Sequence, residues 1–296
     1  MTISEQVSGE ATIQRWTVGD TTITSVVEAE TAHIPPEFFF TGVDAAAVRE
    51  QPDLVPDFAD ADGNITLRVQ ALVVDQPGRR VLVDPCVGNG KQRALPFWHE
   101  QAWPFMERFA DAGFDAASID VVVHTHLHAD HVGWDTHVVD GTWVPTFTGA
   151  RHLYTAAEIE HCRSNAMPGE DVYGDSVGPI VDAGLADIVD GNTDLGDGLR
   201  LEATPGHTPG HVSLWVESGG EAALITGDFV HHPAQLARPT WAEVGDDDVA
   251  LAEETRRRMF ARAAEQEALF IGTHFPTRPA GRVVADGDAW TFVPEP

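Results

Sequence analysis

A run of histidines with one aspartate, within positions 126 to 131, holds the side chains best suited to chemistry. Its members are His126, His128, Asp130 and His131. Four strong ligands packed this tightly are costly to bury without a metal, because each needs a partner once it leaves water. In an extended segment, His126 and His128 point the same way and can grip one ion, while Asp130 and His131 can address a second. The run indicates a hydrolytic metal site rather than a group of exposed histidines.

Three further ligand candidates each lie at the end of a predicted strand. They are His207 in the segment Thr-Pro-Gly-His, Asp228 in Thr-Gly-Asp-Phe, and His274 in Gly-Thr-His-Phe. Strand ends at one edge of a sheet can hold side chains rigidly toward one point. The glycine close to each candidate lets the backbone approach closely. The second ligand set strengthens the interpretation as a metal site.

The elements that must position these residues alternate between strands and helices. Period-2 and short apolar patterns predict strands at 12–27 (a hairpin turning at Gly19-Asp20), 67–74, 80–84, 121–124, 151–154, 199–203, 212–217, 222–226, 269–272, 281–285 and 289–293. Helices are predicted at 103–112, 156–163, 176–183 and 246–267, the last with Asp247 or Asp248 as N-cap. Residues 32–40 fit no periodic pattern. The mixture predicts two packed sheets with helices outside, in a single domain of residues 1–296.

The net charge of the chain limits the kinds of molecule that it can bind. The 296 residues carry a net charge of −29, and Lys91 is the only lysine. A protein that binds phosphate backbones needs Lys and Arg, so the balance argues against nucleic acid and against an anionic membrane surface. No apolar run approaches the roughly 18 residues of a membrane span, and Met1 to Glu10 lack a signal pattern. Two cysteines, Cys86 and Cys162, are expected to be reduced, which favours a cytoplasmic location.

Together, the blocks His126-x-His128-x-Asp130-His131, Thr-Pro-Gly-His207, Gly-Asp228 and Gly-Thr-His274 resemble the metallo-β-lactamase superfamily. They stand in the right order over about residues 65–275. The resemblance implies an α+β fold, a four-layer αββα sandwich with a dinuclear site at one edge of the sheets. It further implies the ligand sets: His126, His128 and His207 for one metal, Asp130, His131 and His274 for the other, and Asp228 as the bridge.

Two divalent cations roughly 3.5–4 Å apart can share a water and lower its pKa to about 7, which provides a hydroxide nucleophile without a serine or cysteine. The imidazole-rich set suits zinc best, with manganese, iron or cobalt as alternatives. Within the superfamily, the segment from Asp228 to Leu236 is similar to acyl-homoserine lactonases and the methyl-parathion-hydrolase group. We therefore expect a hydrolase that opens a lactone or cleaves a carboxylic ester. The alternatives are an organophosphate triesterase and, in another reaction class, an iron-dependent persulfide dioxygenase. Relatives are often dimers, so the resemblance also implies a possible homodimer.

One position departs from this pattern. The best-known acyl-homoserine lactonases have a tyrosine three residues after the bridging aspartate, where this chain has His231 followed by His232. His231 could donate a hydrogen bond to the substrate oxygen or protonate the leaving alkoxide; otherwise it supports a ligand or packs in the core. Asp130 and His231 are the predicted catalytic residues.

Supporting roles are predicted for three other residues. Asp84, at a strand end, either holds a ligand histidine or caps a turn. His211 is expected to support its loop by hydrogen bonding, and His124 to be a packed core residue within its strand.

A small, neutral, hydrophobic ester or lactone would suit an apolar pocket with few cations. Aromatic residues near the ligand blocks or in loops are the predicted walls of that pocket. They are Phe38, Phe39, Phe40, Phe97, Trp98, Trp134, Phe229 and Phe275. For the three consecutive phenylalanines, a plug into the core is the competing interpretation.

Overall fold

The computed structural model describes residues 13–295, so the predicted start of the first hairpin at Thr12 and the expectation for Met1 to Glu10 lie outside the described residues. The described chain forms two compact units. The first unit holds residues 30–68 and 191–295, and the second holds residues 13–29 and 69–190. A single domain over residues 1–296 stays a prediction.

One seven-stranded sheet has the order β1-β2-β3-β4-β5-β8-β9. Its strands are β1 (Ile13–Val18), β2 (Thr21–Ile34), β3 (Ile65–Gln76), β4 (Arg79–Val83), β5 (Val121–Val123), β8 (Arg151–Thr155) and β9 (Ala186–Val189). The β1–β2 and β3–β4 pairs are antiparallel, and β4, β5, β8 and β9 run parallel. Most of this sheet belongs to the second unit. A separate hairpin of β6 (Thr136–Val139) and β7 (Thr142–Pro145) turns at Asp140 and Gly141.

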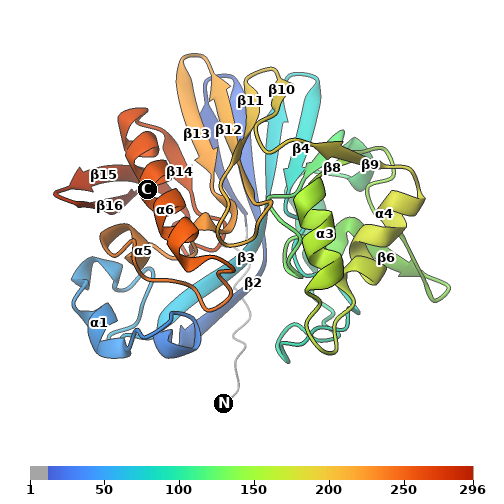
Figure 1. Cartoon of the computed structure of the whole chain (residues 1–296). Coiled ribbons are helices and arrows are strands. Elements are labelled where there is room, and N and C mark those ends of the chain that lie inside the picture. The colour runs from blue at the N-terminus through green and yellow to red at the C-terminus, as the bar shows by residue number, and fades with distance from the viewer. Residues whose placement is uncertain (1–12, 296) are drawn as a thin grey trace. The chain divides into compact units, whose positions relative to one another are not determined.

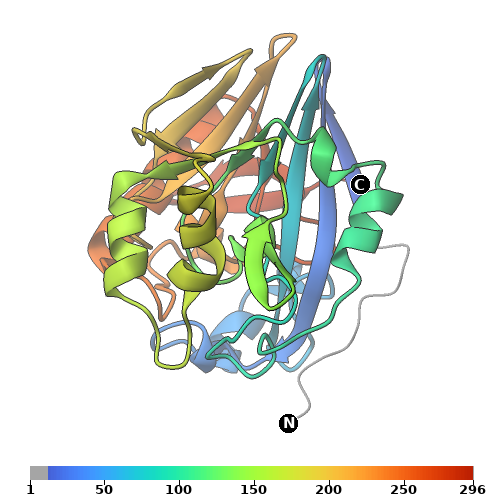
Figure 2. The ribbon, with the colours of Figure 1, turned by 90° about the vertical axis from the view of Figure 1, so that its right-hand side faces the viewer.

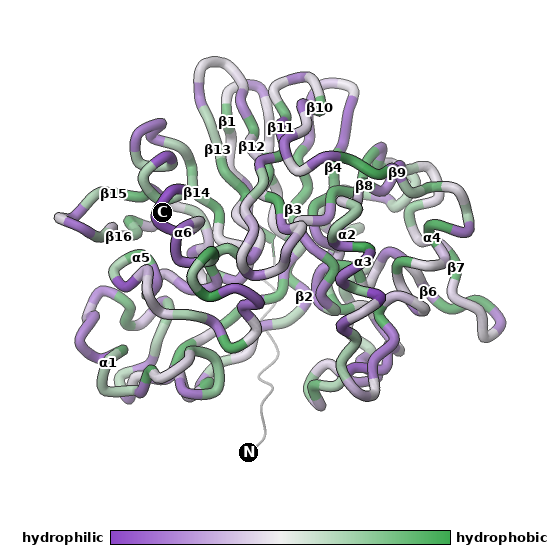
Figure 3. Tube along the Cα trace, viewed as in Figure 1, coloured by the Kyte–Doolittle hydropathy of each residue, from purple (hydrophilic) through white to green (hydrophobic). Residues whose placement is uncertain are grey.

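The other seven-stranded sheet lies wholly in the first unit, with its strands in chain order. They are β10 (Asp194–Gly196), β11 (Leu199–Ala203), β12 (Val212–Ser218), β13 (Glu221–Ile225), β14 (Leu269–Ile271), β15 (Ala280–Asp286) and β16 (Ala289–Pro294). Only β13 and β14 pair in parallel. They do so because helix α6 (Val249–Glu265) lies between them in the chain and crosses back over the sheet. The hydrophilic turn between β15 and β16 stands out in Figure 3.

Helices cover the sheets within each unit. They are α1 (Ala45–Arg49), α2 (Phe105–Asp111), α3 (Ala156–Ser164), α4 (Gly178–Asp182), α5 (Ala234–Ala237) and α6 (Val249–Glu265). In the first unit, α6 lies beside β13 and β14 (Figure 1) and buries Met259 and Phe260 in the cluster that contains Leu224 and Phe270. In the second unit, α2 lies along the sheet (Figure 2) and its Phe105 joins the cluster of Leu82 and Val122. Among residues 13–295, no helix has the length and apolarity needed to cross a membrane.

The sequence located most of the longer elements, but several ends differ. Strand β2 continues to Ile34, through residues that the sequence left without regular structure, and Pro36–Phe38 form a 3-10 turn. Strand β5 ends at Val123, so the prediction that His124 lies inside the strand is wrong. The short elements α1, α5, β9 and β10 and the strands β6 and β7 were not predicted, because few residues of each carry a periodic signal.

Lys91 is fully buried in the second unit. Its ammonium donates hydrogen bonds to Thr136 Oγ1 at 2.6 Å, to the Asp175 carbonyl at 2.7 Å and to Ser176 Oγ at 3.1 Å. It also lies 3.8 Å from the centre of the Trp143 ring. Burial lowers the pKa of Lys91 to about 8. The only lysine therefore contacts Thr136, the Asp175–Ser176 segment and Trp143 inside the second unit, and its side chain is not exposed to solvent.

The segment after β4 is pressed against the loop that follows the histidine run. Gly133 N donates to Cys86 O at 2.6 Å, and Trp134 N donates to Pro85 O at 2.8 Å. A Cβ atom added at Gly133 would lie 1.7 Å from Val87 O, which no side chain can tolerate. Glycine is required at 133 by this close approach of two backbones.

We expect the Gly133→Ala variant to lose about 3 kcal/mol of unfolding free energy, because the two segments must separate to admit the methyl group. Urea unfolding of the purified protein measures the loss. Gly149→Ala is the matched control in the same unit, since its added Cβ would meet nothing closer than 3.9 Å. Equal stability of the two variants would contradict the proposed contact.

Candidate functional site

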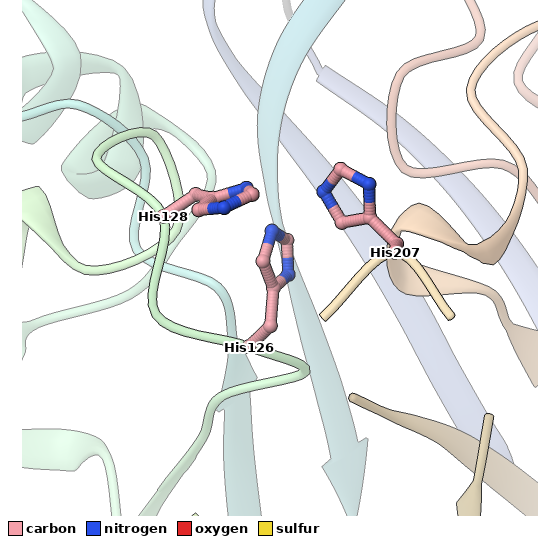
Figure 4. Close-up of side chains that lie close together, drawn as sticks. All are labelled: His126, His128 and His207. Carbon is pink, nitrogen blue, oxygen red and sulfur yellow. The ribbon is translucent and has the colours of Figure 1, made fainter. Parts of the chain in front are cut away.

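The second unit brings the four residues of the histidine run together. His126, Asp130 and His131 are buried and His128 is half-buried. The His126 ring centre lies 4.5 Å from that of His128 and 4.0 Å from that of His131. Asp130 Oδ2 lies 3.6 Å from His131 Nε2. These residues follow β5 in an irregular loop, so it is the loop, not the predicted extended segment, that brings together the His126 and His128 rings drawn in Figure 4.

Asp84 lies behind this loop and supports two of its histidines. Its Oδ1 accepts the Thr125 backbone N–H at 2.8 Å, and its Oδ2 accepts the Thr125 hydroxyl at 2.7 Å. Oδ2 also lies 3.0 Å from His131 Nδ1. Since the Thr125 hydroxyl donates to Asp84, its oxygen accepts the Nδ1–H of His126, 3.1 Å away. Asp84 thus fixes the tautomer of His126 through Thr125, and it lies on the Nδ1 side of the His131 ring, so the Nε2 atoms of both rings face away from it.

Two buried glutamates that the sequence analysis did not single out hold the surrounding backbone. Glu158 in α3 accepts the Leu127 N–H at 3.0 Å. Glu28 in β2 accepts the N–H groups of Val87 at 2.7 Å and Gly88 at 3.2 Å, and Trp134 Nε1–H at 2.6 Å. Burial raises the pKa of Glu28 to about 7 despite these hydrogen bonds.

A second cluster that the sequence did not reveal surrounds Asp135. This buried carboxylate lies 3.0 Å from His124 Nε2 and 3.1 Å from His152 Nδ1, and it accepts the Tyr154 hydroxyl at 3.0 Å. His124 Nδ1 donates to Leu153 O at 3.2 Å, so both of its ring nitrogens carry protons. Burial alone would lower the pKa of His124, but the Asp135 charge raises it overall. His124 is buried as predicted, as part of a polar network rather than an apolar core.

The first unit brings together the three remaining candidates around the Asp228 carboxylate. Asp228 Oδ2 lies 3.0 Å from His274 Nε2 and 3.8 Å from His207 Nε2. The Asp228 backbone N–H donates to His211 Nε2 at 2.7 Å, and His211 Nδ1–H in turn donates to Thr204 Oγ1 at 2.7 Å. His211 therefore connects the Asp228 backbone to Thr204 through its two ring nitrogens.

Each histidine candidate of the first unit also has a hydrogen-bond acceptor behind its ring. His207, drawn in Figure 4, has its Nδ1 3.1 Å from Asp246 Oδ1. His274 Nδ1 donates to Arg68 O at 2.7 Å. Metal-binding imidazoles are commonly held in this way, with Nδ1 on a protein acceptor and Nε2 facing the ion. The donor set thus fits a metal centre on chemical grounds in both units.

His231 lies among these residues. Its Nε2 is 3.1 Å from Asp228 Oδ2, its ring stacks on that of His274 with centres 5.6 Å apart, and its centre lies 4.7 Å from that of His207. His232 is different, because its Nε2 donates to Phe58 O at 2.9 Å and its Nδ1 accepts the Ala234 N–H at 3.1 Å. Burial lowers the pKa of His232 to about 4, so it is a neutral structural residue.

Burial and packing correct part of the predicted aromatic pocket. Phe40, Phe229 and Phe275 are fully buried in the core of the first unit, and Trp134 stacks on Phe105 in the core of the second. These four are core residues; Phe229 and Phe275 directly follow Asp228 and His274, and neighbouring side chains point to opposite sides of the backbone. Phe38 is 73% exposed.

The other three predicted pocket residues are only partly buried. Phe97 and Trp98 contact each other edge to face at 5.5 Å. The Phe39 ring centre lies 5.3 Å from that of His231, so Phe39 is the residue of this set that contacts a predicted catalytic residue.

We expect Asp84→Asn to cost about 2 kcal/mol of unfolding free energy in chelator-treated protein, because the amide NH₂ would oppose the Thr125 hydroxyl or His131 Nδ1–H and leave a buried donor unpaired. Urea unfolding measures this. Asp187→Asn serves as control, since Asp187 pairs with Arg151 at the surface and its loss should cost less than about 1 kcal/mol. Similar values for both variants would contradict the supporting role of Asp84.

Comparisons with known proteins identify the family of the chain. The family profile described as the metallo-β-lactamase superfamily matches residues 65–278. A β-lactamase-like protein 2 homolog of Caenorhabditis elegans is 33% identical over 116 residues, 38% of this chain and 31% of that protein. The N-acyl homoserine lactonase AttM of Rhizobium radiobacter is 27% identical over 233 residues, 70% of this chain and 82% of that protein. The first two curated relatives are matched over 31% and 53% of their own lengths.

Solved structures share the fold over nearly the whole chain. The hydrolase AbOPH of the β-lactamase superfamily superposes with a TM-score of 0.80 at 23% identity, covering 99% of both chains. AidC, a dizinc quorum-quenching lactonase, superposes with a TM-score of 0.77 at 20% identity, covering 96% of this chain and 97% of its own. Since the family profile spans most of the chain and contains every ligand candidate, the chain belongs to the metallo-β-lactamase superfamily and has its fold.

Proposed function

We propose that this protein is a dinuclear metal-dependent hydrolase that opens lactones or cleaves carboxylic esters. The observation that carries the proposal is a protein acceptor oxygen within 3.1 Å of Nδ1 in four of the histidine candidates, which orients each ring so that Nε2 faces away from that acceptor. Those histidines are His126, His131, His207 and His274. A histidine set oriented in this way is costly to build and has little use without a metal.

In the proposed site, His126, His128 and His207 would hold one ion, Asp130, His131 and His274 would hold the other, and Asp228 would be shared between them. Zinc suits this set of ligands best, and manganese, iron or cobalt are alternatives. When bound, the ions supply Lewis acidity and lower the pKa of water to near 7. The chain itself offers no competing thiol nucleophile, because burial raises the pKa of Cys86 well above its usual value and that of Cys162 to about 12.

The remaining residues of the site have roles in binding and proton transfer. Asp84 and His211 keep the ligands in register through the hydrogen bonds described above. His231 is the proposed hydrogen-bond donor to the substrate oxygen, and it can protonate the leaving alkoxide through the same nitrogen. A neutral substrate is favoured because the chain carries a net charge of −29. The lactonase named among the sequence relatives supports the choice of a lactone.

The metal and substrate assignments are tested together. Metal analysis of protein purified without chelator should give about two ions per chain. Zinc- and manganese-loaded protein should then have its highest kcat/KM on an acyl-homoserine lactone or an aryl ester, compared with the phosphotriester paraoxon. Preference for paraoxon would select the triesterase alternative, and metal content near zero would contradict the whole proposal.

We expect His231→Phe to lower kcat about 100-fold on the best lactone or ester, because the transition state loses a proton donor. The number of bound metal ions should not change. His231→Gln, which keeps a donor but cannot protonate an alkoxide, should recover part of the activity. Steady-state kinetics and metal analysis on all three proteins measure this. Turnover of His231→Phe equal to that of the wild type would remove His231 from the mechanism.

A further inference from the structure

The segment that carries His207 is attached to the beginning of helix α6. Asp247 N–H donates to His207 O at 3.1 Å, and Asp248 N–H donates to Gly206 O at 2.9 Å. From the second turn of the helix, the Thr255 hydroxyl donates to Pro205 O at 2.7 Å. Three backbone carbonyls in a row are therefore bound by one helix and the residues just before it.

Gly206 allows this close contact. Its φ is +133°, and a Cβ there would lie 2.3 Å from Ala252 N in the first turn of α6. The sequence Thr-Pro-Gly-His therefore does more than permit a turn, because it lets His207 lie against the helix start.

The side chain of His207 is held from the same direction by Asp246. The Asp246 side chain is fully buried, and its Oδ1 lies 3.1 Å from His207 Nδ1. Its Oδ2 lies 3.1 Å from the guanidinium of Arg256, which is also fully buried, and accepts the Glu243 N–H at 3.2 Å. Arg256 Nε–H donates to Pro239 O at 2.8 Å, which anchors the guanidinium in turn.

The contact between Arg256 and Asp246 orients the carboxylate that faces His207. A carboxylate buried beside a single imidazole would be poorly solvated and free to rotate. Arg256 neutralises its charge and fixes its plane through a second oxygen, so the first oxygen stays on the His207 ring. The imidazole must then carry its proton on Nδ1, and its Nε2 is available as a ligand.

We propose that Asp246 and Arg256 are a positioning pair that sets the tautomer and orientation of His207 for metal binding. This inference rests on the proposed function, in which His207 is a ligand. Neither residue is expected to touch substrate. Their effect passes through one imidazole, so it should change metal affinity and the position of one proton.

The test compares wild type with Asp246→Asn and Arg256→Gln. Zinc affinity is measured by competition with a chromophoric chelator, and the His207 tautomer is measured in zinc-free protein by long-range ¹H–¹⁵N correlation NMR. We expect 10- to 100-fold weaker zinc binding in both variants. We also expect the His207 signal to change from a single Nδ1–H form to a mixture with Nε2–H: in Asp246→Asn because an amide can donate where the carboxylate only accepts, and in Arg256→Gln because the Asp246 carboxylate loses the contact that fixes its plane.

Arg262→Gln is the matched control. It removes an arginine from the same helix whose partner, Glu202, is likewise a buried carboxylate, at 2.7 Å. It should therefore reproduce any general loss of stability without changing zinc affinity or the His207 tautomer. Thermal unfolding of each protein checks that the variants fold.

The outcomes separate the two proposals. Wild type that binds no zinc contradicts the proposed function. Wild type that binds zinc, together with variants that keep the same affinity and the same tautomer, overturns the positioning role of Asp246 and Arg256. If one of the two variants fails to fold, the other decides by the same criteria.

Discussion

The carboxylate of Asp84 is the constraint on which the second unit's half of the site depends. A buried carboxylate must receive hydrogen bonds to offset the loss of water; Asp84 accepts two from Thr125 and lies 3.0 Å from His131 Nδ1. The backbone supports this at a cost, since Asp84 and Cys86 both have positive φ values of 52° and 49°. Any movement of the loop would leave that charge without donors, so the ligand geometry is fixed before a metal arrives.

In the first unit, the histidine candidates are supported by different groups. Asp246 shares its charge with Arg256, whereas His274 has only the neutral carbonyl of Arg68 behind it. An imidazole backed by a carboxylate is a stronger base than one backed by a carbonyl. The proposed ligands are therefore not equivalent, and in the proposed assignment His274 is the weaker donor of its set.

The ligand candidates could be found from the sequence because they occupy short blocks and the ends of apolar strands. Most long strands and α6 were found for the same reason, since each carries a long periodic pattern. The residues that hold the ligands could not be found in this way. Asp246 lies 39 positions from His207, and Asp84 lies 41 from Thr125, so no local sequence pattern connects the members of either pair. The prediction that Phe229 and Phe275 line a pocket was wrong, because the side chains of neighbouring residues point to opposite sides of the backbone and these two point into the core.

The burial of Lys91 has a consequence for handling the protein. Its amine is the only lysine amine in the sequence, and it is enclosed by Thr136, Asp175, Ser176 and the Trp143 ring. The folded surface therefore presents no lysine to acylating reagents or cross-linkers, and its positive charge comes from arginine. Modification of Lys91 requires the second unit to open, so its labelling rate would report directly on how often that unit unfolds.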